Sequence, residues 1–238
     1  MLFSVATARM HYGCDYRLKR IHMNAPGILT NGVFLYDFWK GTYLSVEEMD
    51  WKAVEKVVSV FEECGLSCFV YVYEDEKISI YYDDENLEKQ TQYFSKRALE
   101  SCREVKRIEN YEEILWKGKA CYIAYTGEKQ KLASVCVRLD EIEGIDYSFY
   151  LNIYNGLCCL EIFSSKANKQ NALLKLKKLL SCEEVVVFGD NLNDLPMIEI
   201  ADRSYAPENA LKEVKGKVNG ILADCAHDGV AHFLLKEV

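Results

Sequence analysis

Residues 185–194 read VVVFGDNLND, and this stretch decides the fold. Consecutive apolar residues at 185–188 are typical of a strand buried on both faces, as in a parallel sheet. Two acids follow the strand, Asp190 and Asp194, and the second lies where a short helix is expected to begin. In open α/β sheets, ligands bind in the crevice at the carboxyl ends of the strands. The stretch therefore predicts a parallel α/β core with two carboxylates in its crevice.

Two interpretations of these acids stay open from the residues alone. Paired carboxylates suit Mg²⁺, a hard cation that prefers oxygen ligands, and backbone N–H groups at a helix start suit a phosphate. The alternative is structural: Asn193 or Asp194 caps the helix, and Asp190 merely ends the strand.

The two ends of the chain have similar patterns. At the front, residues 2–6 and 27–30 read as two short buried strands of parallel type. At the back, the strand at 185–188 alternates with predicted helices, as in a parallel sheet. These helices are expected at residues 171–180, 196–201, 208–215 and 229–236.

The middle of the chain has a different, antiparallel pattern. A helix is predicted over residues 45–61, with Ser45 as its N-cap and Gly65 just past its end. Two hairpins follow, residues 68–73 with 78–82 and residues 148–154 with 157–163, the second turning at Asn155-Gly156. We therefore expect an α/β core made of residues 1–44 and 165–238, with an α+β domain at residues 45–164 inserted into it.

Composition narrows the class of partner and compartment. The 238 residues carry 29 Lys and Arg against 37 Asp and Glu, a net charge of −8, and no basic stripe, so nucleic acid is not an expected partner. No apolar run reaches the length of a membrane span, and the opening residues lack a basic leader. Ten scattered cysteines without a C-x-x-C spacing favour reduced thiols. We expect a cytoplasmic protein without a membrane partner.

The motif Gly189-Asp190-x-x-Asn193-Asp194 after an apolar strand resembles the fourth motif of the haloacid dehalogenase (HAD) superfamily of phosphatases. The segments after it resemble the Cof-type branch of sugar-phosphatase-like enzymes (HAD-IIB). They are Met197, Ala201-Asp202, Ala206-Pro207-Glu208-Asn209-Ala210, Lys215 and Asp228-Gly229-Val230-Ala231. The resemblance implies a Rossmann-like core with an inserted cap domain, and Asp190 and Asp194 as the Mg²⁺ site.

The same resemblance assigns further residues. Lys169 matches the third motif, which implies a catalytic lysine that offsets charge on the bound phosphate; a solvated helix face is the alternative for a lysine in this Lys-rich segment. Thr7 matches the second motif and implies a hydrogen bond to the phosphoryl group, with Arg9 beside it. Asn31 and Asn193 complete the expected phosphate-binding set, although Asn31-Gly32 is also an ordinary tight turn.

One family motif has no counterpart here. The family reaction uses a first motif, Asp-x-Asp, as nucleophile and as general acid, and no Asp-x-Asp occurs in this sequence. The resemblance begins at the second motif, as though a first strand and helix, roughly 30 residues, had been removed. That strand would lie between the strands of the second and fourth motifs, so we expect unpaired strand edges unless another segment or a partner fills the gap.

The sequence thus supports competing functions. The first is a Mg²⁺-dependent phosphatase acting on small phosphorylated metabolites, sugar phosphates above all, through an aspartyl-phosphate intermediate in the complete protein. In that reading the inserted domain covers the crevice and selects the leaving group. The alternatives are a non-catalytic module that binds a phosphorylated ligand, an inactive truncated remnant, and a phosphomutase of the same superfamily.

Overall fold

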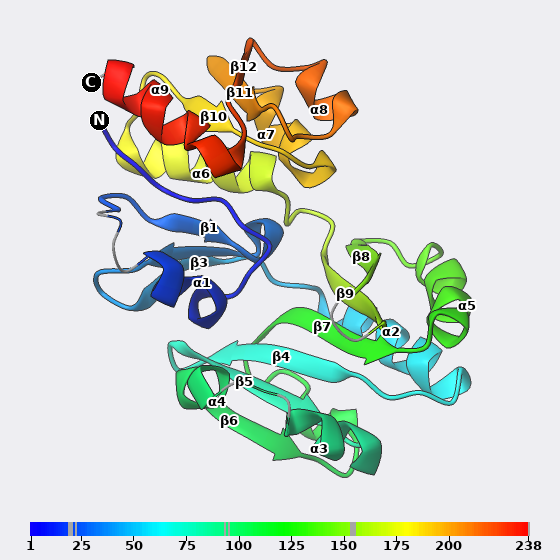
Figure 1. The fold of residues 1–238 in the computed structure, drawn as a ribbon. Coiled ribbons are helices and arrows are strands. Elements are labelled where there is room, and N and C mark those ends of the chain that lie inside the picture. Colours follow the sequence, from blue (N-terminus) through cyan, green and yellow to red (C-terminus); the bar gives the residue numbers. More distant parts are fainter. Residues whose placement is uncertain (19–20, 22, 93, 95, 153–155, 238) are drawn as a thin grey trace.

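The computed structural model describes residues 1–18, 21, 23–92, 94, 96–152 and 156–237. Within these residues it contains a six-stranded sheet and two three-stranded sheets, and the two small sheets lie together at one end of the molecule (Figure 1). None of the helices in the described part is long and apolar enough to cross a bilayer.

One small sheet is parallel and comes from the carboxyl-terminal part of the chain. Its strands are β10 (Val186–Phe188), β11 (Arg203–Pro207) and β12 (Gly220–Leu222). The short helices α7 (Leu195–Ile198) and α8 (Lys212–Lys215) and the helix α9 (Gly229–Glu237) connect or follow these strands. The predicted strand at 185–188 and the three helices exist, with shifted ends. Strands β11 and β12 were not predicted: β11 reads RSYAP, without an apolar run, and β12 has only three residues.

Helix α6 (Lys169–Leu180) connects the two small sheets. It begins at Lys169, two residues before the predicted start, and the side chain of its N-cap residue Asn168 accepts a hydrogen bond from the Asn171 N–H. Ala172 and Leu176 pack against the small sheet formed by the front of the chain. Leu173 packs there too and also contacts the apolar cluster of the parallel sheet. The helix predicted from Leu/Lys periodicity is therefore confirmed, and its burial fixes Lys169 at its first position.

The second small sheet comes from the front of the chain and is antiparallel. It contains β1 (Gly27–Leu29), β2 (Phe34–Asp37) and β3 (Thr42–Val46), with the 3₁₀ turn η1 (Thr30–Gly32) after β1 and helix α1 (His11–Leu18) before it. The expected strand at residues 2–6 is reduced to one parallel bridge between Ala6 and Ile28. The hydrogen bonds that tie this segment to β1 are those of the Val5 carbonyl and the Thr7 N–H to Ile28.

A gap separates residues 2–6 from β10. A cavity of about 380 Å³ lies there, lined by residues of both segments and by α6. β10 pairs with β11 on its other side. The unpaired strand edges expected from the sequence are thus present in the described part of the chain.

The large sheet has the strand order β6-β5-β4-β7-β9-β8. Its strands are β4 (Phe69–Glu74), β5 (Lys77–Tyr82), β6 (Cys102–Arg107), β7 (Lys119–Gly127), β8 (Ile145–Leu151) and β9 (Cys158–Ser164). The hairpins β4–β5 and β8–β9 confirm both predicted pairings, and residues 153–155 of the second turn lie outside the described residues. Short helices α3 (Glu85–Thr91) and α4 (Lys96–Ser101) connect β5 with β6.

Helices α2 (Trp51–Glu63) and α5 (Lys129–Leu139) cover one face of this sheet and form its main apolar core. The helix predicted from residue 45 therefore exists, but Ser45 is not its cap. Ser45 lies in β3, and the Asp50 side chain accepts the Lys52 N–H at the start of α2. β-branched and aromatic residues at 42–46 favour a strand, which delays the helix. We propose the division into residues 1–44 with 165–238 and residues 45–164, although β3 extends past it to Val46.

The opposite face of the large sheet carries tyrosines around Glu161 of β9. The Tyr150 hydroxyl donates to Glu161 Oε1 at 2.7 Å. Burial raises the pKa of Glu161, and hydrogen bonds from Tyr150 and Tyr122 oppose this only in part. The folded chain therefore favours the neutral carboxyl.

This shift predicts a pH dependence of stability. A carboxyl whose pKa is raised on folding stabilises the fold below its ordinary pKa, about 4.3, and loses that contribution as pH rises through the raised value. We expect Glu161→Gln, which keeps the acceptor for Tyr150, to raise the free energy of unfolding at pH 7 and to have little effect near pH 4. Urea denaturation at both pH values measures this difference. The exposed acid substitution Glu213→Gln is the control, and a Glu161→Gln effect independent of pH would contradict the prediction.

Candidate active site

A buried ion pair lies where α6 and the loop after β10 meet. Lys169 Nζ is 2.5 Å from Asp194 Oδ1, and the two residues are only 5% and 4% exposed. A buried charge is tolerated when it is paired and hydrogen-bonded. Lys169 is the first residue of α6 and Asp194 the last residue of the 3₁₀ turn η3 (Leu192–Asp194), so the pair joins the two elements.

The second oxygen of Asp194 organises the loop. Asp194 Oδ2 accepts the N–H groups of Asp190 at 2.9 Å and of Asn191 at 3.0 Å. A Cβ on Gly189 would lie 2.6 Å from the Asp194 Cβ, so glycine allows the loop to close around this carboxylate. Asp194 is therefore the third residue of a capping box whose N-cap is Asn191, and it also holds the charge of Lys169. Its side chain makes no cap bond to α7, so the helix cap expected in the structural interpretation does not form. Each of its oxygens has a partner from this chain.

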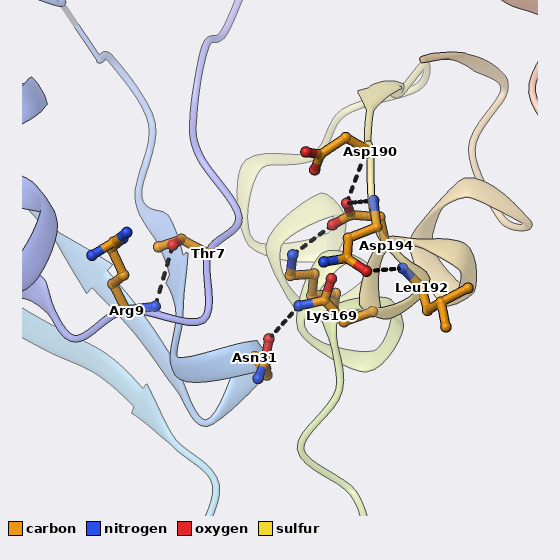
Figure 2. A network of polar contacts seen from close by, with 9 residues as sticks. Thr7, Arg9, Asn31, Lys169, Asp190, Leu192 and Asp194 are labelled. Carbon is orange, nitrogen blue, oxygen red and sulfur yellow. Dashed lines mark hydrogen bonds and ion pairs between the residues drawn. The ribbon is translucent and has the colours of Figure 1, made fainter. Parts of the chain in front are cut away.

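Asp190 is placed differently. It follows β10 and Gly189 directly, its residue is exposed, and Figure 2 shows its carboxylate directed away from Asp194. Mg²⁺ in proteins commonly takes one or two carboxylates and fills its shell with waters and substrate phosphate oxygens. Among the described residues, no group of three His, Cys, Asp or Glu side chains forms a closed metal cage. The donor chemistry at Asp190 fits an open Mg²⁺ site of this kind.

Two asparagines connect the small sheets at the same edge. Asn193 Nδ2 donates to Asn31 Oδ1 at 3.0 Å, although the two residues are 162 positions apart in the sequence. Asn31 has φ 53° and lies in η1, and its N–H donates to the Thr7 carbonyl at 3.1 Å. Both predicted phosphate-binding asparagines thus lie together beside the end of the segment that carries Thr7.

In Figure 2, Thr7 and Arg9 lie on one side of Asn31 and the charged pair lies on the other. The Thr7 N–H donates to the Ile28 carbonyl at 2.9 Å, and the Arg9 N–H donates to Thr7 Oγ1 at 3.2 Å. The Arg9 residue is exposed. Contacts therefore link six of the predicted residues at the ends of the two small sheets, and Arg9 lies beside Thr7.

Two residues of this arrangement were not predicted as part of the site. Asn168 caps α6 and so orients Lys169, and Asn191 caps η3. The preference of helix N-caps for asparagine is the signal that could have found both. Neither side chain is assigned a direct role in binding.

A family model described as haloacid dehalogenase-like hydrolase matches residues 1–234. The chain belongs to this family.

Curated relatives in the family carry phosphatase names. Pyridoxal phosphate phosphatase YbhA of Escherichia coli is 22% identical over 239 residues, covering 97% of this chain and 84% of the relative. HMP-PP phosphatase of Yersinia enterocolitica is 25% identical over 242 residues, covering 98% and 82%. HMP-PP phosphatase of Klebsiella pneumoniae is 30% identical over 116 residues, which is 47% of this chain and 42% of the relative. That last match spans less than half of either protein.

Solved structures of HAD members share the fold. TM0651 from Thermotoga maritima superposes with a TM-score of 0.73 at 21% identity, covering 100% of this chain and 85% of that one. BT4131, described as a HAD subclass IIB sugar phosphatase, superposes with a TM-score of 0.67 at 17% identity, covering 99% and 85%. These likenesses confirm the predicted α/β HAD fold.

Proposed function

We propose that this HAD-family chain is a Mg²⁺-dependent phosphatase of small phosphorylated metabolites that works, in its complete form, through an aspartyl-phosphate intermediate. The observation that carries the proposal is the buried Lys169–Asp194 pair beside the exposed Asp190 carboxylate, at the carboxyl end of β10. The Lys169 ammonium and the Asp190 carboxylate would then meet a ligand at the end of the parallel sheet, where such sheets bind ligands.

Each residue has a separate task in this proposal. The Lys169 ammonium has three N–H donors, and the bond to Asp194 leaves two for phosphate oxygens, where they offset developing charge. Thr7, Asn31 and Asn193 supply hydrogen bonds to the phosphate, and Arg9 assists from the margin. Asp190 would hold Mg²⁺, which when bound neutralises phosphate charge. Asp194 keeps Lys169 and the Asp190 backbone in place and, as second predicted metal residue, supports the metal site.

The substrate class follows from the relatives only as a proposal. The names of two relatives specify pyridoxal phosphate and HMP-PP, and one solved structure is described as that of a sugar phosphatase. We propose small phosphate esters as the class, with sugar phosphates first. The inserted domain at residues 45–164 is proposed to cover the crevice and select the leaving group.

Asp190→Asn tests the metal role without disturbing the fold. The Asp190 backbone N–H is the group that Asp194 holds, so the variant should melt at the same temperature as the parent. We expect Mg²⁺ to strengthen phosphate binding by the parent about tenfold and to have no effect on the variant, because a neutral amide is a poor Mg²⁺ ligand. Calorimetric titration with inorganic phosphate, with and without Mg²⁺, measures this.

Glu213→Gln makes the same charge change at an exposed position on α8 and serves as the control. Equal Mg²⁺-linked binding by parent and Asp190→Asn would remove Asp190 from the metal site.

A non-catalytic phosphate-binding module is the second candidate, because Lys169, Asn31 and Asn193 could hold a phosphate without any catalytic step. Both candidates predict Mg²⁺-linked phosphate binding, but only the phosphatase predicts release of inorganic phosphate from a sugar phosphate. Intact mass and amino-terminal sequencing of the protein from its own source shows whether Asp-x-Asp accompanies this chain. Release of phosphate that disappears in Asp190→Asn would decide for the phosphatase.

A further inference from the structure

The two edge strands of the large sheet differ in charge. The strand order β6-β5-β4-β7-β9-β8 leaves β6 and β8 at the edges (Figure 1). Four of the six residues of β6, CREVKR, are charged, and charged side chains protect an edge strand against pairing with another chain. β8 reads IDYSFYL, and Asp146 is its only charged residue. It also contains no proline or glycine, and its ladder with β9 has no bulge, so β8 is the less protected edge.

The ladder with β9 decides which backbone groups of β8 point outward. The Asn152 N–H donates to the Leu157 carbonyl at 2.8 Å, and the Ser165 N–H donates to the Gly144 carbonyl at 3.0 Å. Both bonds continue the register of the ladder, so the even-numbered residues of β8 bond to β9. The N–H and C=O groups of the odd-numbered residues therefore point to the free edge. These residues are Ile145, Tyr147, Phe149 and Leu151.

The outward groups of these four residues make no backbone hydrogen bond within the part of the chain that the structure describes. One outward donor has a local side-chain partner, because the Tyr147 N–H donates to Asp146 Oδ1 at 2.8 Å on the exposed surface. Such a bond exchanges easily with water or with another acceptor. A row of outward donors and acceptors is a template for a further strand.

The side chains of β8 have a near-palindromic order around Ser148. Aromatic residues flank it at 147 and 149, an acid and a tyrosine hydroxyl follow at 146 and 150, and aliphatic residues end the strand at 145 and 151. In an antiparallel pair of two such strands centred on Ser148, aromatic rings face aromatic rings and aliphatic side chains face aliphatic ones. The Asp146 carboxylate then faces Tyr150 instead of its own copy. The order of residues thus favours a second copy of this chain over an unrelated strand.

The exposed side chains of β8 agree with this pairing. Tyr150 is 47% exposed and Leu151 is 57% exposed, although both lie in a regular strand. In the centred pair, Ile145 of the second copy would cover Leu151, and the second copy's Asp146 would lie beside Tyr150. One arrangement therefore satisfies the outward backbone groups and reduces the exposure of these side chains.

We propose that β8 pairs antiparallel with β8 of a second copy of this chain, about a two-fold axis at Ser148. The hydrogen-bonded pairs are Tyr147 with Phe149 and Ile145 with Leu151 of the other copy, and the Phe149 carbonyl takes over the Tyr147 N–H from Asp146. The two large sheets become one continuous sheet with a charged β6 strand at each end, so assembly stops at two copies. This inference rests on the edge strand and is independent of the proposed function.

Residue 148 offers a direct test, because it faces its own copy only if the two-fold axis passes through it. Its neighbours Tyr147 and Phe149 pack toward the apolar core, so residue 148 lies on the other face and its substitution spares that core. We expect the parent, 27.4 kDa per chain, to sediment as a dimer at concentrations up to about 0.1 mM. Ser148→Lys and Ser148→Glu should each raise the Kd of the dimer about tenfold, since like charges would then lie directly opposite.

An equimolar mixture of Ser148→Lys and Ser148→Glu should restore the dimer, because lysine then faces glutamate. This rescue also shows that both variants are folded. Gln92→Lys adds the same charge as Ser148→Lys at an exposed position after α3, and it should leave the Kd unchanged. A parent that sediments as a single chain, a Kd that Ser148→Lys does not change, or a mixture that stays unpaired would overturn the proposal. Assemblies of more than two copies would overturn it as well.

Hydrogen exchange provides a second readout of the same pairing. At a total chain concentration ten times the Kd, about one fifth of the chains remain single, so the outward amides of Phe149 and Leu151 should exchange about fivefold more slowly than in dilute solution. The amides of β6, at the other edge, should not depend on concentration. Equal behaviour of the two edges would contradict pairing through β8.

Discussion

Replacing Asp194 with alanine is expected to lower the free energy of unfolding by about 3–5 kcal/mol, because the substitution leaves the buried Lys169 ammonium without its partner. Lys169 is 5% exposed and 2.5 Å from Asp194 Oδ1, so water cannot replace the lost carboxylate easily. The N–H groups of Asp190 and Asn191 lose their acceptor as well. Urea denaturation of parent and variant measures the change.

A double-mutant cycle separates the charge pair from general damage. Lys169→Met should also destabilise the chain, since Asp194 then keeps an unpaired charge. The double variant, Lys169→Met with Asp194→Ala, should lose less free energy of unfolding than the sum of the two single losses. The exposed pair Lys217–Glu199, at 3.6 Å, is the control, and its removal should cost less than about 1 kcal/mol. Additive effects at the buried pair would contradict the pairing argument.

Gly32→Ala is expected to destabilise the chain by about 2–4 kcal/mol and to weaken phosphate binding at the same time. Gly32 has φ +106°, a conformation that alanine rarely adopts, and its Cβ would lie 2.3 Å from the Asn168 carbonyl oxygen. Asn168 caps the helix that begins with Lys169. The added methyl group must therefore push the start of α6 away from η1, and Lys169 moves with it.

Gly65→Ala provides a matched control for this strain. Gly65 also has a positive φ, +66°, but a Cβ added there, just past the end of α2, would meet nothing within 4 Å. Gly65→Ala should lower the free energy of unfolding by about 1 kcal/mol, because only the backbone conformation is strained, and it should leave phosphate affinity unchanged. The comparison uses the same urea and calorimetric measurements, and equal losses for the two glycines would show that contact with Asn168 is unimportant.

The parts of the fold that were predicted correctly depend on local signals. Apolar residues 185–188 with Gly189 were sufficient to locate β10, and the Tyr- and Val-rich segments around residue 75 were sufficient for the β4–β5 hairpin. Errors occurred where the outcome depends on distant neighbours. Residues 2–6 have the composition of a buried strand but have one strand beside them, and Ser45 was drawn into β3 by its pairing with Leu35.

The candidate site shows the same division between local and long-range information. Motif spacing identified Asp190, Asp194 and Lys169, but it does not distinguish an exposed carboxylate from a buried one. That difference arises because Asp194 folds back onto the N–H groups of its own loop while α6 brings Lys169 against it. The close approach that requires Gly32 likewise joins segments that lie far apart in the sequence.

The bond between Asn31 and Asn193 has a consequence for the order of folding, because it closes a loop of 162 residues. The β4–β5 and β8–β9 hairpins bring together residues close in sequence, so they can form early at low entropic cost. The crevice can form only when both ends of the chain meet, after the large sheet between them has shortened the connection. Refolding is therefore expected to restore tyrosine burial in the large sheet before it restores phosphate binding.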